Sequence, residues 1–422
     1  MTWLGLNRNK KAVTPVGNRR GIMSVEERVA IVGAGPVGLL SALGLAQAGI
    51  PVIVIERASE IIASPRAIIY HWSVLEGLDR LGLLEEALDV GFAKQDYTYL
   101  DFATGEKINY SLDVLDGRTS FPFNLHLGQN LLAGIALRRL QQFPHAEVRW
   151  GVTMRDLMQD GSGVTLSVDG PEGPSELRAG WVIGADGATS KVRRALHLEF
   201  EGITWPKRFI AANVRHDFSK HGYARTTFLI HPTHGAIIVK LDKDDLWRCT
   251  YSEPLDLPEE SIAERMTAYF DVILPGARDI EVVAFAPYRM HQRAAERFRV
   301  GRVLLAGDAA HATNPSGAYG LTSGLFDAFA LYEALAAVVR GDVDGAVLDR
   351  YAEERRRIFL EVVSPAAVDN KRIIFDTTDP EQHEANLIRL RRLTDKEVLL
   401  DRLMLTVRMR SEASARRDLR SV

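Results

Sequence analysis

The chain has 422 residues, of which 46% are apolar and 25% are charged, and its formal net charge is −3. This length predicts two or three domains around a sizeable core, and the interspersed charges give no reason to expect nucleic acid as a partner. The single cysteine, Cys249, excludes an internal disulfide and any metal site made of several cysteines. A lone cysteine also fits a reducing compartment, so we expect a cytoplasmic protein with no bound metal.

The start of the chain differs from the rest in composition. Residues 1–22 contain five basic residues and no acidic residue, and they lack the apolar stretch of a secretory signal. We expect 1–23 to be a disordered basic leader, or to lie upstream of a natural start near Met23. No apolar run approaches the roughly 18 to 20 residues that cross a bilayer, so we expect no contact with a membrane.

The first folded elements predicted are a strand, a glycine-rich turn and a helix. The apolar, β-branched run 28–32 stops at Gly33, and the Leu/Ala-rich stretch 39–48 ends before Gly49. Such a turn lets a pyrophosphate approach the backbone at the helix N-terminus. A second strand, 51–55, ends at an acid that suits ribose hydroxyls. The nucleotide contacts expected here are Gly33, Gly35, Pro36, Val37, Gly38, Glu56 and Arg57.

Alternating helical and strand patterns follow along the chain. Helices are predicted through the leucines of 75–84 and over 131–140, and strands at 148–150, 164–168 and 181–184. Short strand-like runs then indicate an antiparallel sheet with an inserted helix at 261–270. These runs lie at 209–214, 226–230, 236–241, 247–252 and 281–286.

The last third of the chain returns to the buried-strand pattern. Residues 303–306 predict a buried strand, and 324–339 predict a long Ala/Leu helix that completes the first domain. Helical segments at 386–393 and 396–409 indicate a cap or an oligomer-facing tail, with exposed amphipathic helices as the alternative.

Two further glycine–aspartate segments follow predicted strands, at 184–187 and 307–311. Asp308 follows a buried strand and leads into a turn of small residues, so its carboxylate can accept hydrogen bonds from ligand hydroxyls. The alternative, a helix cap, fits less well because Pro315 lies ahead. Asp186 also fits a simple Asp-Gly turn.

Together, the three segments resemble those of the FAD-dependent aromatic hydroxylases, the single-component flavoprotein monooxygenases related to para-hydroxybenzoate hydroxylase, over about 27–365. The resemblance implies an α/β fold in which a Rossmann-like FAD-binding domain is interleaved with an antiparallel-sheet substrate domain and followed by a helical C-terminal tail. The expected boundaries are a leader at 1–23, FAD-binding parts at 24–100, 126–200 and 291–365, a substrate-domain excursion at 101–125, the substrate domain at 201–290 and the tail at 366–422.

The resemblance also assigns cofactor contacts residue by residue. It places Asp186 and Gly187 near the pyrophosphate and Asp308 on the ribityl hydroxyls. His311 follows Asp308 by three residues, and we expect it to position the loop or to be a structural residue, with no part in proton transfer. The other contacts that the resemblance implies are Arg66, Gln129, Gly307, Pro315, Gly317, Gly320, Leu321 and Thr322.

Two departures from the family pattern stand out. Relatives carry Gly-Gly-Gln-Gly-Met-Asn where this chain has 317–322, so Tyr319 adds bulk near the flavin ring and Thr322 replaces an asparagine. Many relatives also have a second arginine after the position of Arg66, which 68–73 lacks. These changes affect the orientation of the substrate and the movement of the flavin.

A mechanism follows from the resemblance. Because the chain has one dinucleotide fingerprint, NADH or NADPH is expected to bind transiently. Reduced flavin then reacts with O2 to give a C4a-hydroperoxide that hydroxylates a small phenolic or N-heteroaromatic ring. The chemistry belongs to the flavin, and we assign no catalytic side chain.

The side chains that hold the substrate are less defined. Candidates combine an aromatic or apolar face with a polar group, and we expect Arg225 or His231 to meet a carboxylate or phenol. The candidates are Tyr70, His71, Tyr223, Arg225, His231, Tyr288 and Pro315.

Alternatives on the same scaffold are a flavin-dependent halogenase, a prenyl-lipid reductase or a non-enzymatic flavin-binding sensor. A halogenase is disfavoured because the chain lacks a Trp-x-Trp-x-Ile-Pro segment. A homodimer is possible.

Overall fold

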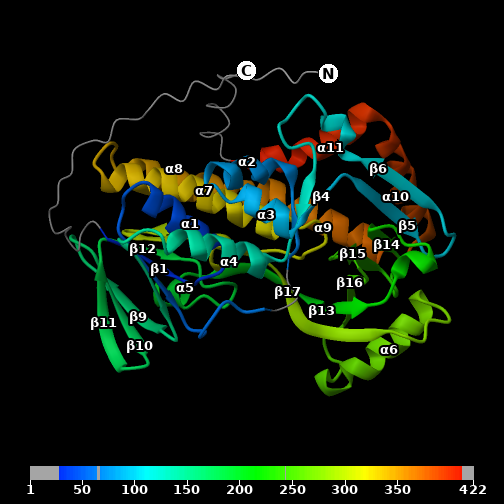
Figure 1. Cartoon of the computed structure of the whole chain (residues 1–422), viewed down its shortest axis with the longest axis horizontal. Helices are drawn as coiled ribbons and strands as arrows, with labels where there is room; N and C mark the ends of the chain where they lie inside the picture. The colour runs from blue at the N-terminus through cyan, green and yellow to red at the C-terminus, as the bar shows by residue number, and fades with distance from the viewer. Residues whose placement is uncertain (1–27, 64–66, 243, 411–422) are drawn as a thin grey trace, which may run out of the picture.

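The computed structural model describes residues 28–63, 67–242 and 244–410. The expected leader at 1–23 and Arg66 therefore lie outside the described residues. Figure 1 shows two lobes side by side, with the long helices α7 (Tyr319–Val339) and α8 (Ala346–Ile358) running across one of them.

The first lobe is built on a six-stranded sheet with the order β18-β19-β12-β1-β2-β8. All its neighbouring pairs are parallel except β18 with β19. Helices α1 (Pro36–Gln47), α4 (Gln129–Leu140) and α7 pack beside this sheet. Its strands are β1 (Val29–Val32), β2 (Val52–Glu56), β8 (Ala146–Trp150), β12 (Trp181–Gly184), β18 (Arg299–Val300) and β19 (Val303–Leu305). The expected Rossmann-like domain is confirmed.

Smaller elements flank this domain. An antiparallel sheet of β9 (Thr153–Gln159), β10 (Val164–Gly170) and β11 (Gly173–Ala179) lies beside α5 (Lys191–Ala195). Helices α2 and α3 and a second three-stranded sheet cover the side near the other lobe (Figure 1). Their bounds are α2 (Trp72–Arg80), α3 (Leu84–Val90), β3 (Ile69–Tyr70), β7 (Asn124–His126) and β4 (Phe92–Lys94).

The second lobe contains an eight-stranded sheet with the order β20-β17-β13-β16-β15-β14-β5-β6. The strands are β5 (Asp96–Asp101), β6 (Lys107–Ser111), β13 (Phe200–Arg215), β14 (Thr226–Ile230), β15 (Ala236–Lys240), β16 (Leu246–Pro254), β17 (Glu281–Ala295) and β20 (His311–Ala312). Each predicted strand forms, but β14 pairs in parallel with β5, so the sheet is mixed rather than wholly antiparallel. The expected excursion at 101–125 overlaps β5 and β6.

The two faces of this sheet have different neighbours, because side chains alternate along each strand. On one face, Ile210, Ala212 and Cys249 pack with the inserted helix α6 (Ile262–Ile273). On the other, Phe209, Val239 and Met290 pack with β3 and with Ala318 of the first lobe. The second face is therefore turned toward the nucleotide segments.

The C-terminal tail packs against the body of the protein. After α8 the chain continues through η6 (Phe359–Val363), α9 (Ser364–Lys371) and η7 (Arg372–Asp376) to α10 (Pro380–Arg391) and α11 (Lys396–Arg408). Arg391 pairs with Glu106 at 2.7 Å, and Arg410 donates to the carbonyl of Ser73 at 2.7 Å. Of the two expectations, a cap is the one that these contacts support (Figure 1).

Helix α7 corrects the expectation that no segment reaches the length of a membrane span. By length and composition α7 could cross a bilayer, and it is the only such helix in the part of the chain that the structure describes. Asp327 and Glu333 interrupt the apolar sequence of α7, so the sequence shows no continuous apolar run of this length. Most of α7 is buried within the protein, so its apolar side chains are covered by the core.

Candidate functional site

The first and second glycine segments touch each other. Gly33 has a φ of +109°, and a Cβ there would lie 2.4 Å from the carbonyl oxygen of Ala185. A Cβ on Gly38 would lie 2.0 Å from the carbonyl oxygen of Gly33. Real Cβ atoms do not approach backbone that closely, so both positions require glycine for the packing of the protein itself.

The third segment meets the first through Val37. A Cβ on Gly307, whose φ is +60°, would lie 2.9 Å from the Val37 side chain, and one on Gly324 would lie 3.0 Å from it. Because the parallel strands end at one edge of the sheet, the three segments gather there although they are far apart in sequence. The structure thus brings together the three glycine segments that follow one another along the sequence.

Gly35 differs from its neighbouring glycines and tests whether the turn fits a dinucleotide. Its φ is −72°, and a Cβ there would meet nothing within 4 Å. Neither strain nor packing within the protein requires glycine at this position, whereas a pyrophosphate approaching the backbone does. Glu56 accepts hydrogen bonds from the Ala34 N–H at 2.8 Å and the Ala58 N–H at 3.0 Å. The turn is therefore preorganised, and its residues fit FAD.

Asp186 is half-buried within the second segment and is held by contacts with the residues that follow it. Its carboxylate accepts hydrogen bonds from the Ser190 hydroxyl at 2.5 Å and from the Lys191 N–H at 2.6 Å, at the start of α5. Burial raises the pKa of Asp186 despite these bonds. The side chain holds the turn together, and Gly187, with a φ of +80°, leaves the backbone exposed to a ligand.

Arg193 ties the second segment to the third, a role that sequence reasoning missed. Its guanidinium donates to the carbonyl of Ala188 at 2.7 Å and to that of Ala309 at 2.8 Å, and it lies 3.7 Å from the ring centre of Phe200. Burial lowers the pKa of Arg193 to about 10, so the side chain remains charged at neutral pH.

A buried ion network fixes the third segment from below. Asp327 accepts from the Gly307 N–H at 2.8 Å, contacts Nε2 of His311 at 2.7 Å and accepts from Nε of Arg355 at 2.6 Å. Burial alone would raise the pKa of Asp327, but His311 and Arg355 outweigh it and lower the pKa to about 2. Asp308 projects outward from this anchored turn and is exposed.

His311 thus contacts Asp327 beneath the loop at 307–311. From this position its side chain can help to hold the loop in place. The roles of Asp327 and Arg355 were not predicted from the sequence. The one signal in the sequence was Asp327 itself, an acidic residue inside an otherwise apolar predicted helix.

The segment 315–322 turns beside His71. The Nε2 atom of His71 lies 2.9 Å from the Gly317 carbonyl oxygen, and the His71 ring stacks on Tyr319 with centroids 5.5 Å apart. Burial lowers the pKa of His71, so the ring is neutral at neutral pH. Thr322 donates its hydroxyl to the Ala318 carbonyl at 3.0 Å.

The other expected cofactor residues lie around the same edge. Gln129 begins α4 and Arg57 is exposed after β2.

The substrate candidates separate into two groups. His71, Tyr288 and Pro315 lie at the loop or on the sheet face that is turned toward it; Tyr288 packs on Phe209 at 6.0 Å. The role of these three residues in substrate binding stays a prediction.

The remaining candidates have other surroundings. Tyr70 packs into the core of the nucleotide domain, and Tyr223 lies under α6, where its hydroxyl donates to the Ile273 carbonyl at 2.8 Å. His231 accepts backbone N–H bonds from Thr233 and His234 in its own turn. Arg225 is exposed. The role of these four residues in substrate binding stays a prediction.

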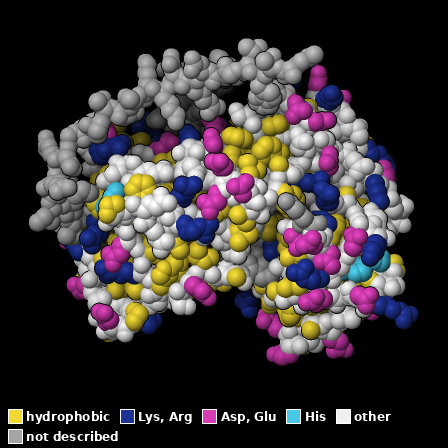
Figure 2. Space-filling view, viewed as in Figure 1, with side chains coloured by type: hydrophobic (Ala, Val, Ile, Leu, Met, Phe, Trp, Pro, Cys, Tyr) yellow, Lys and Arg dark blue, Asp and Glu magenta, His cyan; other side chains and the backbone are white. Residues whose placement is uncertain are grey.

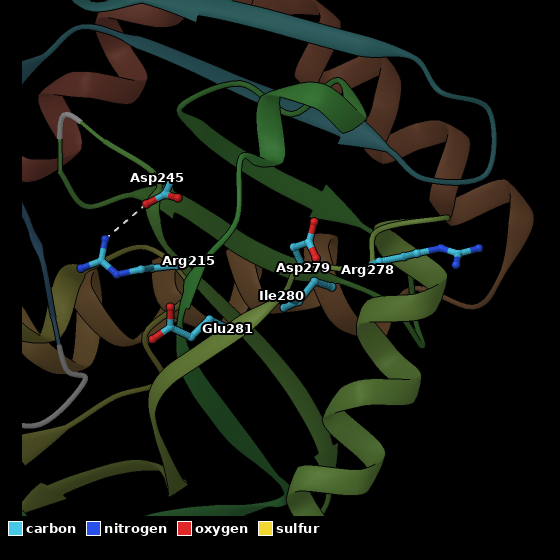
Figure 3. A pocket seen from close by; sticks show the side chains of 6 residues that line it. All are labelled: Arg215, Asp245, Arg278, Asp279, Ile280 and Glu281. Carbon is cyan, nitrogen blue, oxygen red and sulfur yellow. Dashed lines mark hydrogen bonds and ion pairs between the residues drawn. The ribbon is translucent and has the colours of Figure 1, made fainter.

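A shallow surface groove lies at the opposite end of β13, away from these segments. Its volume is about 340 Å³, and Arg215 and Asp245 form an ion pair of 3.2 Å within it (Figure 3). Basic and acidic side chains are likewise interspersed over the face of the protein seen in Figure 2. The mixed charge of the groove selects no ligand. Its lining residues are Arg215, Asp245, Arg278, Asp279, Ile280 and Glu281.

Comparison with known proteins agrees with this geometry. The family described as "FAD binding domain" matches residues 26–366. The chain is 46% identical to 6-hydroxy-3-succinoylpyridine 3-monooxygenase of Pseudomonas putida over 84% of this chain and 90% of that protein. It is 43% identical to para-nitrophenol 4-monooxygenase of a Pseudomonas species over 82% of this chain and 87% of that protein.

A solved structure shows the same architecture. The crystal structure of p-nitrophenol 4-monooxygenase from Pseudomonas putida superposes with a TM-score of 0.88 at 40% identity, covering 92% of this chain and 99% of that one. The fold and site define a flavin-dependent oxidoreductase. The chain belongs to the FAD-dependent aromatic hydroxylase family, and it is an aromatic monooxygenase that uses FAD, NAD(P)H and O2.

Proposed function

We propose that this enzyme hydroxylates a small aromatic ring that already carries a hydroxyl group, either a phenol or a hydroxylated N-heteroaromatic ring. The names of the two relatives describe a hydroxypyridine and a nitrophenol as their substrates. Electrophilic transfer of oxygen needs an electron-rich ring, and a hydroxyl group supplies electron density to the ring.

The observation that carries the proposal is the apolar sheet face opposite the 315–318 turn. Phe209, Val239 and Met290 are almost fully buried there, and Ala318 of the turn packs against them. We propose that the ring lies against half-buried members of the same cluster, Phe228 and Tyr288, where the apolar side chains exclude water from it. Tyr288 adds a hydroxyl to this wall, and burial raises its pKa, so it remains a neutral hydrogen-bond donor.

The protein's own residues position the cofactor and the substrate and do not act as acids or bases. FAD, when bound, supplies the activated oxygen. Gly35, Glu56 and Gly187 fit its dinucleotide part, while Asp308 and Gln129 are proposed to bind the ribityl chain. The proposed contacts near the ring are Arg66, Pro315, Gly317, Gly320, Leu321 and Thr322. Tight packing of His71 against Tyr319 holds this segment in place.

A panel of phenols and hydroxylated pyridines tests the proposal. NAD(P)H consumption by the FAD-loaded enzyme in oxygenated buffer is expected to rise at least tenfold with the correct ring, with formation of a hydroxylated product. Consumption that no member of either class stimulates would contradict the proposal.

Its setting in the cell is also proposed. The dispersed charge supports a cytoplasmic enzyme that binds neither nucleic acid nor membrane, and a homodimer is compatible with the sequence. The candidate domain boundaries given above remain part of this proposal.

A further inference from the structure

The C-terminal helix α11 places a guanidinium among aromatic side chains close to the flavin-side turn. Arg402 donates from Nη2 to the hydroxyl of Tyr99 at 2.9 Å and to Oδ1 of Asn370 at 2.8 Å. Asn370 in turn donates to the hydroxyl of Tyr319 at 3.4 Å. Arg402 lies outside the part of the chain that matches the family, which ends at residue 366.

The guanidinium has unused donors. An arginine side chain has five N–H donors, and those at Nε and Nη1 of Arg402 hydrogen bond to no residue that the structure describes. Within the described ranges, no carboxylate lies within 4.0 Å of this guanidinium either.

Several carboxylates on the surrounding elements have other cationic partners. Asp369 on α9, which is close enough to influence Tyr319 electrostatically, pairs with Arg372 at 2.8 Å and with Arg389 at 2.6 Å. The remaining pairs are Asp401 with Arg408, Glu106 with Arg391 and Asp101 with His383.

Two of the neighbouring tyrosines, Tyr110 and Tyr319, do not neutralise the charge. Burial raises the pKa of Tyr110 and that of Tyr319, so both are neutral hydroxyls at the pH of a cell. Tyr110 stacks on Tyr99 with centroids 6.0 Å apart and is close enough to interact electrostatically with Arg402. A cation surrounded by neutral hydroxyls is a typical setting for binding an anion.

This group is continuous with the proposed ring pocket. Phe228 stacks on Tyr99 at 4.9 Å and also belongs to the apolar cluster that contains Phe209, Tyr288 and Ala318. Tyr319 directly follows the turn at 315–318, and its ring would lie 2.4 Å from a Cβ on Gly317. Tyr319 and its hydrogen-bond partner Asn370 therefore link this turn to Arg402 on α11.

We propose that Arg402, with the hydroxyls of Tyr99, Tyr110 and Tyr319 around it, binds a carboxylate group on the aromatic substrate. This inference rests on the proposed function and narrows it to hydroxylated aromatic acids. Arg402 is a specificity residue: it selects the substrate and has no part in the chemistry at the ring.

Matched acid and amide probes test the inference. The pairs are para-hydroxybenzoate, para-hydroxyphenylacetate and para-hydroxyphenylpropionate, each with its amide, and binding is measured from the change in flavin absorbance of the FAD-loaded enzyme. We expect at least one acid to bind roughly 10- to 100-fold more tightly than its amide, as charge-assisted hydrogen bonds allow.

Variants identify the source of this preference. Arg402→Gln should bind the acid and its amide within about threefold of each other, Arg402→Lys should retain part of the preference because it keeps the charge, and Arg408→Gln on the same helix should match the wild type. FAD content and thermal unfolding are measured alongside. If Arg402→Gln fails to bind FAD, the proposal is tested instead by the acid and amide affinities of the wild type and of Arg402→Lys.

The outcomes separate the two proposals. Equal binding of acids and amides by the wild type, or an acid preference that survives in Arg402→Gln, would overturn the role of Arg402. In that case, hydroxylation of the amides leaves the proposed function intact. If neither acids nor amides are hydroxylated while other phenols and hydroxypyridines also fail, the proposed function falls, and this inference with it.

Discussion

The nucleotide turn and the Arg402 region both help to form the active site, but the sequence specifies them in different ways. At Gly33 and Gly38, backbone geometry leaves no room for a Cβ, so the fold itself restricts the residue type. Around Arg402, the contacts are made by side chains from separate segments, Tyr99 on β5 and Asn370 on α9. Cofactor sites can therefore be recognised from local spacing, whereas substrate sites depend on contacts between distant segments.

The largest effect expected is at Gly38. The Gly38→Ala methyl would collide with the Gly33 carbonyl oxygen, so we expect a loss of more than about 5 kcal/mol and no folded, FAD-loaded protein. Gly35→Ala is the matched control, because its methyl meets no protein atom within 4 Å. Its apoprotein should unfold within about 0.5 kcal/mol of the wild type while FAD binds roughly 10- to 100-fold more weakly.

Urea unfolding of the apoproteins and fluorescence titration with FAD measure these two effects. Normal FAD affinity in Gly35→Ala would show that the open space at this turn does not receive the pyrophosphate.

The second effect concerns the buried network beneath the third segment. Arg355→Leu leaves the Asp327 carboxylate buried without its strong cationic partner, so we expect a loss of about 3 to 5 kcal/mol in unfolding free energy. The double variant Asp327→Asn/Arg355→Leu should recover part of that loss. Chemical denaturation of the wild type, the single variants Arg355→Leu and Asp327→Asn, and the double variant gives the coupling energy, and additive losses would argue against a linked network.

A smaller, pH-dependent effect is expected at His126. Burial lowers the pKa of His126 to about 3, with Lys94 and His71 adding to the shift, and its Nε2 lies 3.1 Å from the Tyr97 hydroxyl. The folded pKa lies below the ordinary value of about 6.5, so the unfolded chain binds the proton first. Stability is complete above pH 6.5 and decreases as the pH falls from 6.5 toward 3.

Between pH 7.5 and 5.5 the wild type should lose about 1.4 kcal/mol that His126→Gln does not lose. Thermal unfolding at both pH values measures the difference. Parallel pH profiles would contradict a buried neutral histidine.

The smallest effect expected is at Tyr223, on the sheet face covered by α6. Tyr223→Phe removes one hydrogen bond to the Ile273 carbonyl, so it should cost about 1 kcal/mol in stability and leave substrate dissociation constants unchanged. Tyr288→Phe, on the face turned toward the flavin segments, is the matched variant and should weaken substrate binding. Similar effects of both variants on binding would remove the distinction between the two faces.

Much of the fold could be predicted from the sequence because its signals are local. The strand β1 ends just before Gly33. The strand-like runs that form β13 to β17 are short and are separated by turn residues. The parallel pairing of β14 with β5 could not be predicted, since 125 residues separate Asp101 from Thr226 and neither strand specifies its partner.

The candidate site, like the fold, could be predicted only where its signals are local in the sequence. The fingerprint glycines are recognised from their spacing, while Asp327, Arg355 and Arg402 act through contacts with distant segments. Tyr223 and His231 were chosen for their side-chain chemistry, but that chemistry says nothing about which face of a sheet they occupy. Tyr223 precedes β14 and His231 follows it, so strand alternation fixes the direction of neither side chain.

The central claim is that three distant segments hold one FAD, which is used to place oxygen on an aromatic ring. The most direct measurement uses purified enzyme reconstituted with FAD, NAD(P)H, the best-bound hydroxylated ring and isotopically labelled dioxygen. The account predicts a yellow protein with one FAD per chain and a product that carries one labelled oxygen atom. A colourless protein that cannot be reconstituted, or a product whose new oxygen comes from water, would contradict it.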